Sequence, residues 1–352
     1  MRGRGDRLEA LLGERQLDRF LVTELTNVRY LTGFTGTNGV CICGPGVRLF
    51  LTDFRYTERA AAEVEGWETL TIADDWLGGI AARLEGRVGF EDDQMAVRTL
   101  ERLREKLAEG VEAVPAGGLV GELRRVKDED ELAAIAEASK LADEVWGWSV
   151  ERGLAGRRER DVARAAEARI RELGADPSFP AIVAAGPNGA LPHAEPGERE
   201  IGRGELVVFD MGAQLDGYCS DGTRTYATGE PGEAARAVYD TVLRAQLASL
   251  EAVKPGAKGE DVDAVAREII AAAGHGDRFG HGLGHGVGLE VHEGPRLSAR
   301  SDDVLAPGEV VTVEPGIYLP GELGVRIEDL VVVTGNGCDN LSSLPKDLQL
   351  VD

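Results

Sequence analysis

The feature of this sequence that most restricts its fold is a repeated order of predicted elements. Each copy is a pair of helices followed by a hairpin of two apolar strands, read from helical and alternating spacings of apolar residues. We therefore predict an internal duplication with pseudo-twofold symmetry and a site between the two halves. In chain order, the predicted elements are a long helix opening at 124–130, a helix over Glu159–Leu173, strands Leu206–Gly212 and Gly217–Thr223, helices over Glu233–Val253 and Asp261–Ala273, and strands Val310–Gly316 and Gly324–Leu330.

The part of the chain before this duplication has a different pattern of predicted elements. Residues 6–120 alternate short helices and strands, with a hairpin turn at Gly44-Pro45-Gly46. The total of 352 residues is enough for two domains of ordinary size. We predict a protein of mixed α/β (α+β) class with two domains, residues 1–122 and 123–352.

Charge and cysteine content narrow the functional classes. Lys and Arg number 39 against 62 Asp and Glu, a net charge of −23. Such a chain repels phosphate backbones and anionic lipid surfaces, so we expect no nucleic-acid partner and no membrane partner. We find no signal-peptide pattern after the basic N-terminus. The scattered cysteines predict free thiols and a cytoplasmic protein; they are Cys41, Cys43, Cys219 and Cys338.

Histidine is rare in this chain and unevenly distributed. Three of the five histidines, His281, His285 and His292, lie within twelve positions of a glycine-rich segment. Glycine lets a ligand approach the backbone closely. A flexible surface loop is the alternative interpretation, but the clustering favours a metal-binding or catalytic role. His275 lies just before this segment, and we assign it to a surface loop.

Four acidic residues accompany apolar runs that we interpret as interior strands. Asp210 follows Leu-Val-Val-Phe, Glu314 follows Val-Val-Thr-Val, and Asp221 and Glu328 lie on the second strand of each hairpin. Carboxylates are rarely buried without partners. Any one of them alone could be a hydrogen-bonded acid at the end of a strand. Four of them on two similar hairpins, with the histidine-rich segment, favour a metal site.

The donor set also indicates the kind of metal site. Four carboxylates nearly neutralise two divalent cations. One imidazole among oxygen donors suits Mn²⁺, Co²⁺, Zn²⁺ or Fe²⁺. We expect two divalent ions per subunit, and the spacing of the donors does not choose among these four metals.

The order of these motifs resembles the "pita-bread" metallopeptidases, peptidase family M24, and within them the proline-specific branch of prolidase (Xaa-Pro dipeptidase) and aminopeptidase P. The motifs are Asp210 and Asp221 eleven residues apart, HGLGH from His281, EPGIY from Glu314 and GVRIED from Gly324. The resemblance extends over nearly the whole chain. It implies a creatinase-like N-terminal domain before a pita-bread catalytic domain. The upstream segments that carry it are Asn27–Phe34, Leu51–Tyr56 and Leu123–Glu131.

The resemblance implies a metal-binding role for five residues. Asp210 would bind one metal ion alone, and Asp221 and Glu328 would bridge the pair. His285 and Glu314 would complete the second metal ion. An activated water would attack the carbonyl before proline, with Glu314 as the acceptor of its proton.

The resemblance also implies roles for residues around the metals. His292 would lie near the tetrahedral oxyanion and His193 near the scissile bond, both as hydrogen-bond donors. His281 would line the proline pocket, and Arg326 would donate to the carboxylate ligands. Tyr318 either touches the substrate or packs in the core.

The family leaves a choice of reaction. We favour an Xaa-Pro dipeptidase because the chain is as compact as short bacterial prolidases, with an Xaa-Pro aminopeptidase acting on longer peptides as the alternative. The expected substrates are small peptides with proline at the second position, and a homodimer is expected. Methionine aminopeptidase, creatinase and a non-enzymatic binding protein on this fold are disfavoured, because all five ligand positions are filled and the N-terminal motifs are present.

Overall fold

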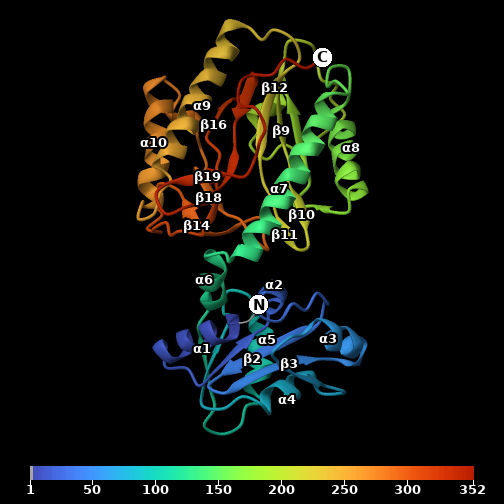
Figure 1. The fold of residues 1–352 in the computed structure, drawn as a ribbon, viewed down its shortest axis with the longest axis vertical. Coiled ribbons are helices and arrows are strands. Elements are labelled where there is room, and N and C mark those ends of the chain that lie inside the picture. The colour runs from blue at the N-terminus through green and yellow to red at the C-terminus, as the bar shows by residue number, and fades with distance from the viewer. Residues whose placement is uncertain (1–2) are drawn as a thin grey trace. The chain divides into compact units, whose positions relative to one another are not determined.

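The computed structural model describes residues 3–352, which form two compact units that divide between Arg124 and Arg125 (Figure 1). Both units combine helices with β-sheet, as the mixed α/β prediction requires. None of the described helices is both long and apolar enough to cross a membrane.

The N-terminal unit is built on one six-stranded mixed sheet, in the order β4-β3-β2-β1-β5-β6. The β2–β3 hairpin turns where Gly46 adopts a φ of 68°, which favours glycine. Along the strands, side chains alternate between faces, and Leu21, Ile42 and Leu51 join the core formed with α4 and α5. The elements are α1 (Arg4–Glu14), β1 (Arg19–Val22), α2 (Leu25–Thr32), β2 (Gly39–Gly44), β3 (Val47–Thr52), α3 (Thr57–Glu63), β4 (Glu68–Thr71), α4 (Trp76–Ala81), β5 (Arg87–Phe90), α5 (Val97–Arg104), β6 (Glu112–Pro115) and α6 (Leu119–Arg125).

The C-terminal unit contains four long helices and several short strands. The long helix α7 begins where Asp128 and Glu131 form a reciprocal capping box. The helices of the C-terminal unit are α7 (Glu129–Val150), α8 (Glu159–Glu172), α9 (Glu233–Ala252) and α10 (Gly259–Ala272). Its strands are β7 (Asp176–Pro177), β8 (Ile182–Ala185), β9 (Leu206–Asp210), β10 (Ala213–Leu215), β11 (Tyr218–Cys219), β12 (Thr223–Ala227), β13 (Gly284–Gly286), β14 (Glu293–Leu297), β15 (Val310–Val313), β16 (Gly316–Leu319), β17 (Leu323–Arg326), β18 (Asp329–Val333) and β19 (Cys338–Asn340).

The predicted duplication is present in this unit. Helices α8 and α10 are both 14 residues long and begin one hundred positions apart, at Glu159 and Gly259. In the first half β9 pairs with β8 and β12, and in the second half β15 pairs with β13 and β18. Helices α7 and α8 lie over the first set of strands, and α9 and α10 over the second (Figure 1).

The prediction of one simple hairpin in each half is wrong in detail. Each half has an outer antiparallel pair, β9–β12 or β15–β18, with a small inner hairpin, β10–β11 or β16–β17, between its strands. In the first half, a close approach of two backbone segments explains why the chain leaves the outer strand pair β9–β12 to form the inner hairpin. A Cβ at Gly212 would lie 1.9 Å from the carbonyl oxygen of Ser220, so the chain can turn there only with glycine.

The two halves meet along a seam between β12 and the β17–β18 segment. Thr223 and Glu328 form an isolated antiparallel bridge across it. Thr225 Oγ1 donates to the carbonyl of Arg326 at 2.8 Å, and the Arg326 amide donates back to that hydroxyl at 3.1 Å. Because Glu328 is one of the predicted ligands, the seam places the candidate site between the halves.

Candidate active site

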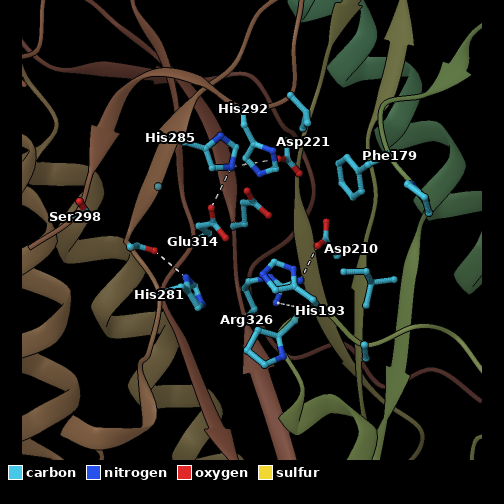
Figure 2. A pocket seen from close by; sticks show the side chains of 18 of the residues that line it. Phe179, His193, Asp210, Asp221, His281, His285, His292, Ser298, Glu314 and Arg326 are labelled. Atoms are coloured by element: carbon cyan, nitrogen blue, oxygen red, sulfur yellow. Dashed lines mark hydrogen bonds and ion pairs between the residues drawn. The ribbon is translucent and has the colours of Figure 1, made fainter. Parts of the chain in front are cut away.

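A cavity of about 630 Å³ opens in the C-terminal unit between its two halves. All the predicted site residues line it: His193, Asp210, Asp221, His281, His285, His292, Glu314, Arg326 and Glu328. Figure 2 shows acidic and imidazole side chains converging on it from both halves. The duplication therefore brings together residues that are more than a hundred positions apart in the chain.

Three of the predicted ligands already have the spacing of a metal site. Potential donor atoms of Asp221, His285 and Glu328 all lie within 4.8 Å of one another. His285, at the centre of β13, places Nε2 3.6 Å from Asp221 Oδ2 and 3.3 Å from Oε1 of Glu314, which follows β15. Asp221 lies two residues before β12 and Glu328 one residue before β18, near the start of the last outer strand of each half.

The fourth carboxylate of the predicted set, Asp210, ends strand β9 and is only 8% exposed. Arg326 Nη2 donates to its Oδ2 at 2.6 Å. Its Oδ1 is buried and has no hydrogen-bond partner among the described residues. A buried carboxylate oxygen without a partner is costly, and a cation bound there would satisfy it.

The electrostatics of the acids support the same conclusion. Burial, followed by the negative charges of neighbouring carboxylates, raises the pKa of Asp221 and of Glu328 well above their ordinary values. Burial also raises the pKa of Asp210, against the charge of Arg326. Glu314 differs, because its hydrogen bond and charge interaction with His285 outweigh burial and lower its pKa to about 2. The acids repel one another, and bound divalent cations would relieve that repulsion, so the residues fit a metal centre.

A hydrogen-bonded network holds these carboxylates in place. Arg326 Nε donates to Thr223 Oγ1 at 3.0 Å, and that hydroxyl donates to Glu328 Oε2 at 2.7 Å. Thr312 Oγ1 donates to Glu314 Oε1 at 3.2 Å. Arg326 thus contacts Asp210 directly and reaches a second carboxylate, Glu328, through Thr223.

His281 lies on a wall of the cavity beside Gly282 and Gly284. Its Nε2 is 2.8 Å from the hydroxyl of Tyr318, and its ring meets Phe279 edge-on at 5.0 Å between centroids. Burial lowers the pKa of His281, which favours a neutral ring. Tyr318 is 6% exposed and also accepts a hydrogen bond from Arg326 Nη1, so it packs in the core and links the two residues.

The remaining histidines occupy different environments. The His292 ring packs against the His285 ring at an interplanar angle of 57°, with centroids 4.3 Å apart, and faces the cavity (Figure 2). Burial, and then the charge of His285, lowers the pKa of His292. His193 is exposed at the rim. His275 lies before a short 3-10 turn, outside the residues that line the cavity.

The sequence analysis missed one cationic residue of the cavity. Arg296 on β14 faces His285 across the strand pair, and its exposed side chain lines the cavity. Within the part of the chain that the structure describes, its guanidinium pairs with no acid. Its position four residues after His292, in the same segment, was the available signal.

Comparisons with known proteins cover both units. Residues 133–335 match the model of "Metallopeptidase family M24", and residues 4–126 match that of the "Creatinase/Prolidase N-terminal domain". The chain is 42% identical over 348 residues to an uncharacterized peptidase of Bacillus subtilis, covering 97% of this chain and 98% of that protein. It is 37% identical over 351 residues to the Xaa-Pro dipeptidase of Pyrococcus furiosus, covering 99% and 100%.

Solved structures agree with these sequence matches. An Xaa-Pro dipeptidase from Bacillus anthracis superposes with a TM-score of 0.96 at 39% identity, covering 99% of both chains. An X-Pro aminopeptidase from Thermotoga maritima superposes with a TM-score of 0.90 at 35% identity, covering 98% of this chain and 100% of that one.

Proposed function

The chain belongs to metallopeptidase family M24, and on that premise we propose that it is an Xaa-Pro dipeptidase, cutting the bond before the carboxy-terminal proline of a dipeptide. The observation that carries this proposal is the cavity itself, in which a cluster of metal-type donors and a free arginine line the same space. The relative named Xaa-Pro dipeptidase, 37% identical over nearly the whole chain, supports it.

We propose that five residues hold two divalent cations, with Mn²⁺ as the favoured ion. The unpartnered oxygen of Asp210 and the spacing of the other donors support this assignment. When bound, the cations would supply Lewis-acid activation of a water and of the scissile carbonyl. The proposed ligands are Asp210, Asp221, His285, Glu314 and Glu328.

The other roles belong to side chains around that centre. Glu314 would accept the proton of the attacking water at a carboxylate oxygen, although its lowered pKa limits its basicity. His292 and His193 would donate hydrogen bonds to oxygens that gain negative charge. His281 and its glycine neighbours would form the apolar wall against the proline ring.

Arg296 supports the choice of a dipeptide over a longer peptide. A dipeptide presents a free carboxylate just beyond the proline ring. A guanidinium without an acidic partner binds such a group through charge-assisted hydrogen bonds. A longer peptide would present a neutral amide there and gain less.

Two further properties are proposed on weaker grounds. The four cysteines are free thiols in the structure, which supports a cytoplasmic protein. The match of residues 4–126 to the creatinase/prolidase N-terminal domain supports a homodimer by analogy with the family.

The deciding experiment compares Ala-Pro, Ala-Pro-Ala and Ala-Ala with Mn²⁺-loaded wild type and Arg296→Met. We expect kcat/KM for Ala-Pro to exceed that for the other two. Losing a charged hydrogen-bond partner should cost Arg296→Met at least about tenfold on Ala-Pro, mainly in KM, and little on Ala-Pro-Ala. Equal or better cleavage of the tripeptide by wild type would assign an Xaa-Pro aminopeptidase, a reading that the similarity to the Thermotoga maritima structure favours.

A further inference from the structure

We infer that an ion pair on helix α10, Asp263 with Arg267, positions the wall of the proline subsite by clamping the segment 279–283, which carries His281. This inference rests on the proposed function, in which His281 packs against the proline ring. Neither Asp263 nor Arg267 lines the cavity, so both would act through the segment that they hold.

The ion pair is bidentate and protected from water on its acidic side. Asp263 is fully buried, and Arg267 donates through Nε to Asp263 Oδ2 at 2.5 Å and through Nη2 to Oδ1 at 3.0 Å. The two residues are one helical turn apart, so α10 itself sets their geometry. Two parallel hydrogen bonds of this kind fix the orientation of the guanidinium as well as its distance from the carboxylate.

The same two side chains bind the backbone of the neighbouring segment at three points. Arg267 Nη1 donates to the carbonyl of Phe279 at 3.0 Å, and Nη2 donates to the carbonyl of His281. Asp263 Oδ1 accepts from the amide of Leu283 at 3.0 Å. The guanidinium also lies over the Phe279 ring, 4.4 Å from its centroid.

These contacts matter because they fix the backbone between two core residues, Phe279 and Leu283, where the segment is rich in glycine. Gly280 and Gly282 flank His281, and glycine on both sides leaves the backbone with wide conformational freedom. With the carbonyls of Phe279 and His281 fixed, the imidazole is held between the Phe279 edge and the Tyr318 hydroxyl (Figure 2 shows the ring at the cavity wall). Without the clamp, the ring loses its fixed orientation toward the substrate.

The first half of the unit provides an internal comparison. One hundred positions earlier, Ala163 and Glu167 of α8 take the places of the clamp residues, and Ala181 takes that of His281. Glu167 Oε1 accepts from the amide of Ala181 at 3.1 Å. The same helical position thus reaches the same loop position in both halves. Only the half whose loop carries an imidazole has the paired acid and arginine.

The test compares Arg267→Met and Arg267→Lys with wild type. Arg169→Met is the control, because it removes the ion pair between Arg169 and Glu172 at the surface of α8. Removing the charged donors should lower kcat/KM for Ala-Pro about tenfold, mostly through KM. The weak cleavage of Ala-Ala and the metal content should stay unchanged. Arg267→Lys should recover part of the loss, and Arg169→Met should behave as wild type. Hydrogen exchange at the Leu283 amide should be faster in Arg267→Met.

The outcomes separate this inference from the proposed function. Wild type that does not prefer Ala-Pro over Ala-Ala would refute the proposed function. Wild type with that preference, together with an Arg267→Met variant that keeps it, would overturn the clamp alone. So would a variant that loses metal and slows on both peptides to the same degree, because that pattern indicates a purely structural role. Arg267→Lys keeps the positive charge next to buried Asp263, so it remains informative if Arg267→Met does not fold.

Discussion

The two halves of the catalytic unit share a scaffold but contribute different chemistry. The first half supplies Asp210 and Asp221, and the second supplies Glu314, Glu328 and all three histidines of the glycine-rich segment. The strand pairings and the second helix of each half nevertheless match closely. The difference shows that the duplicated framework sets where side chains project, while substitutions at matching positions decide what they do.

The asymmetry is concentrated beside the cavity. The loop position held by the second helix carries a methyl group in one half and an imidazole in the other, at Ala181 and His281. The acids that precede the last outer strand, Asp221 and Glu328, keep the symmetry instead. In the proposed assignment these two acids bridge a pair of metal ions, which calls for oxygens from both halves, whereas substrate recognition requires the halves to differ.

The largest expected loss of activity comes from altering Asp221 or Glu328, the acids found in both halves. Asp221→Asn or Glu328→Gln removes a charge that balances the cations, so each variant should lose at least one metal ion per chain and nearly all of kcat while staying folded. Elemental analysis and peptide assays would measure both. The matched controls are Asp216→Asn and Glu322→Gln, exposed acids at the tips of the two inner hairpins. A bridging variant with two metals and normal turnover would contradict the assignment.

The next largest effect concerns His292, a histidine supplied by the second half. His292→Ala should lower kcat by about 100-fold with a smaller change in KM, because a donor to a developing oxyanion acts mainly in the transition state. His275→Ala, which alters a histidine outside the cavity in the same half, should leave both constants unchanged. Steady-state kinetics on Ala-Pro would measure this, and similar behaviour of the two variants would refute the role of His292.

The smallest effect is expected at the seam between the halves, where two threonines can be compared. Thr223→Val removes the hydroxyl between Arg326 and Glu328, and should weaken metal binding about tenfold, as expected for a partner of a metal ligand. Thr225→Val loses bonds to the Arg326 backbone only, so its metal affinity should be normal. Both should lower the free energy of unfolding by about 1–2 kcal/mol. Calorimetric metal titration and denaturant unfolding would separate them, and equal metal affinities would show that Thr223 does not act on the site.

Much of the site could be predicted because its signals are local. A carboxylate that follows an apolar strand, as Asp210 and Glu314 do, is unusual wherever it occurs. Several helices followed directly from apolar spacing: those expected over Glu159–Leu173 and Glu233–Val253 are found at Glu159–Glu172 and Glu233–Ala252. The short elements α2, α4, β4 and β6 carry too few residues for a periodic pattern and were not predicted.

The rest depends on contacts between distant residues, which spacing does not encode. Asp263 and Arg267 have the spacing of an ordinary surface ion pair on a helix, and only the packed structure shows that they reach the backbone near His281. The sequence marks Arg296 only by its position four residues after His292, and the strand pairing is needed to show that it lies beside His285 at the cavity. The inner hairpins depend on how closely the chain approaches itself at Gly212.

The bridge between Thr223 and Glu328 also constrains the order in which the protein matures. The two residues are 105 positions apart, so during synthesis the first half emerges long before its partner strand exists. Until then the first half offers only Asp210 and Asp221, without the histidine and the two glutamates of the second half. Under the proposed ligand assignment, the complete metal site forms only after closure of this long loop. Metal content would then mark chains that have completed folding, and the metals would not be a nucleus on which folding begins.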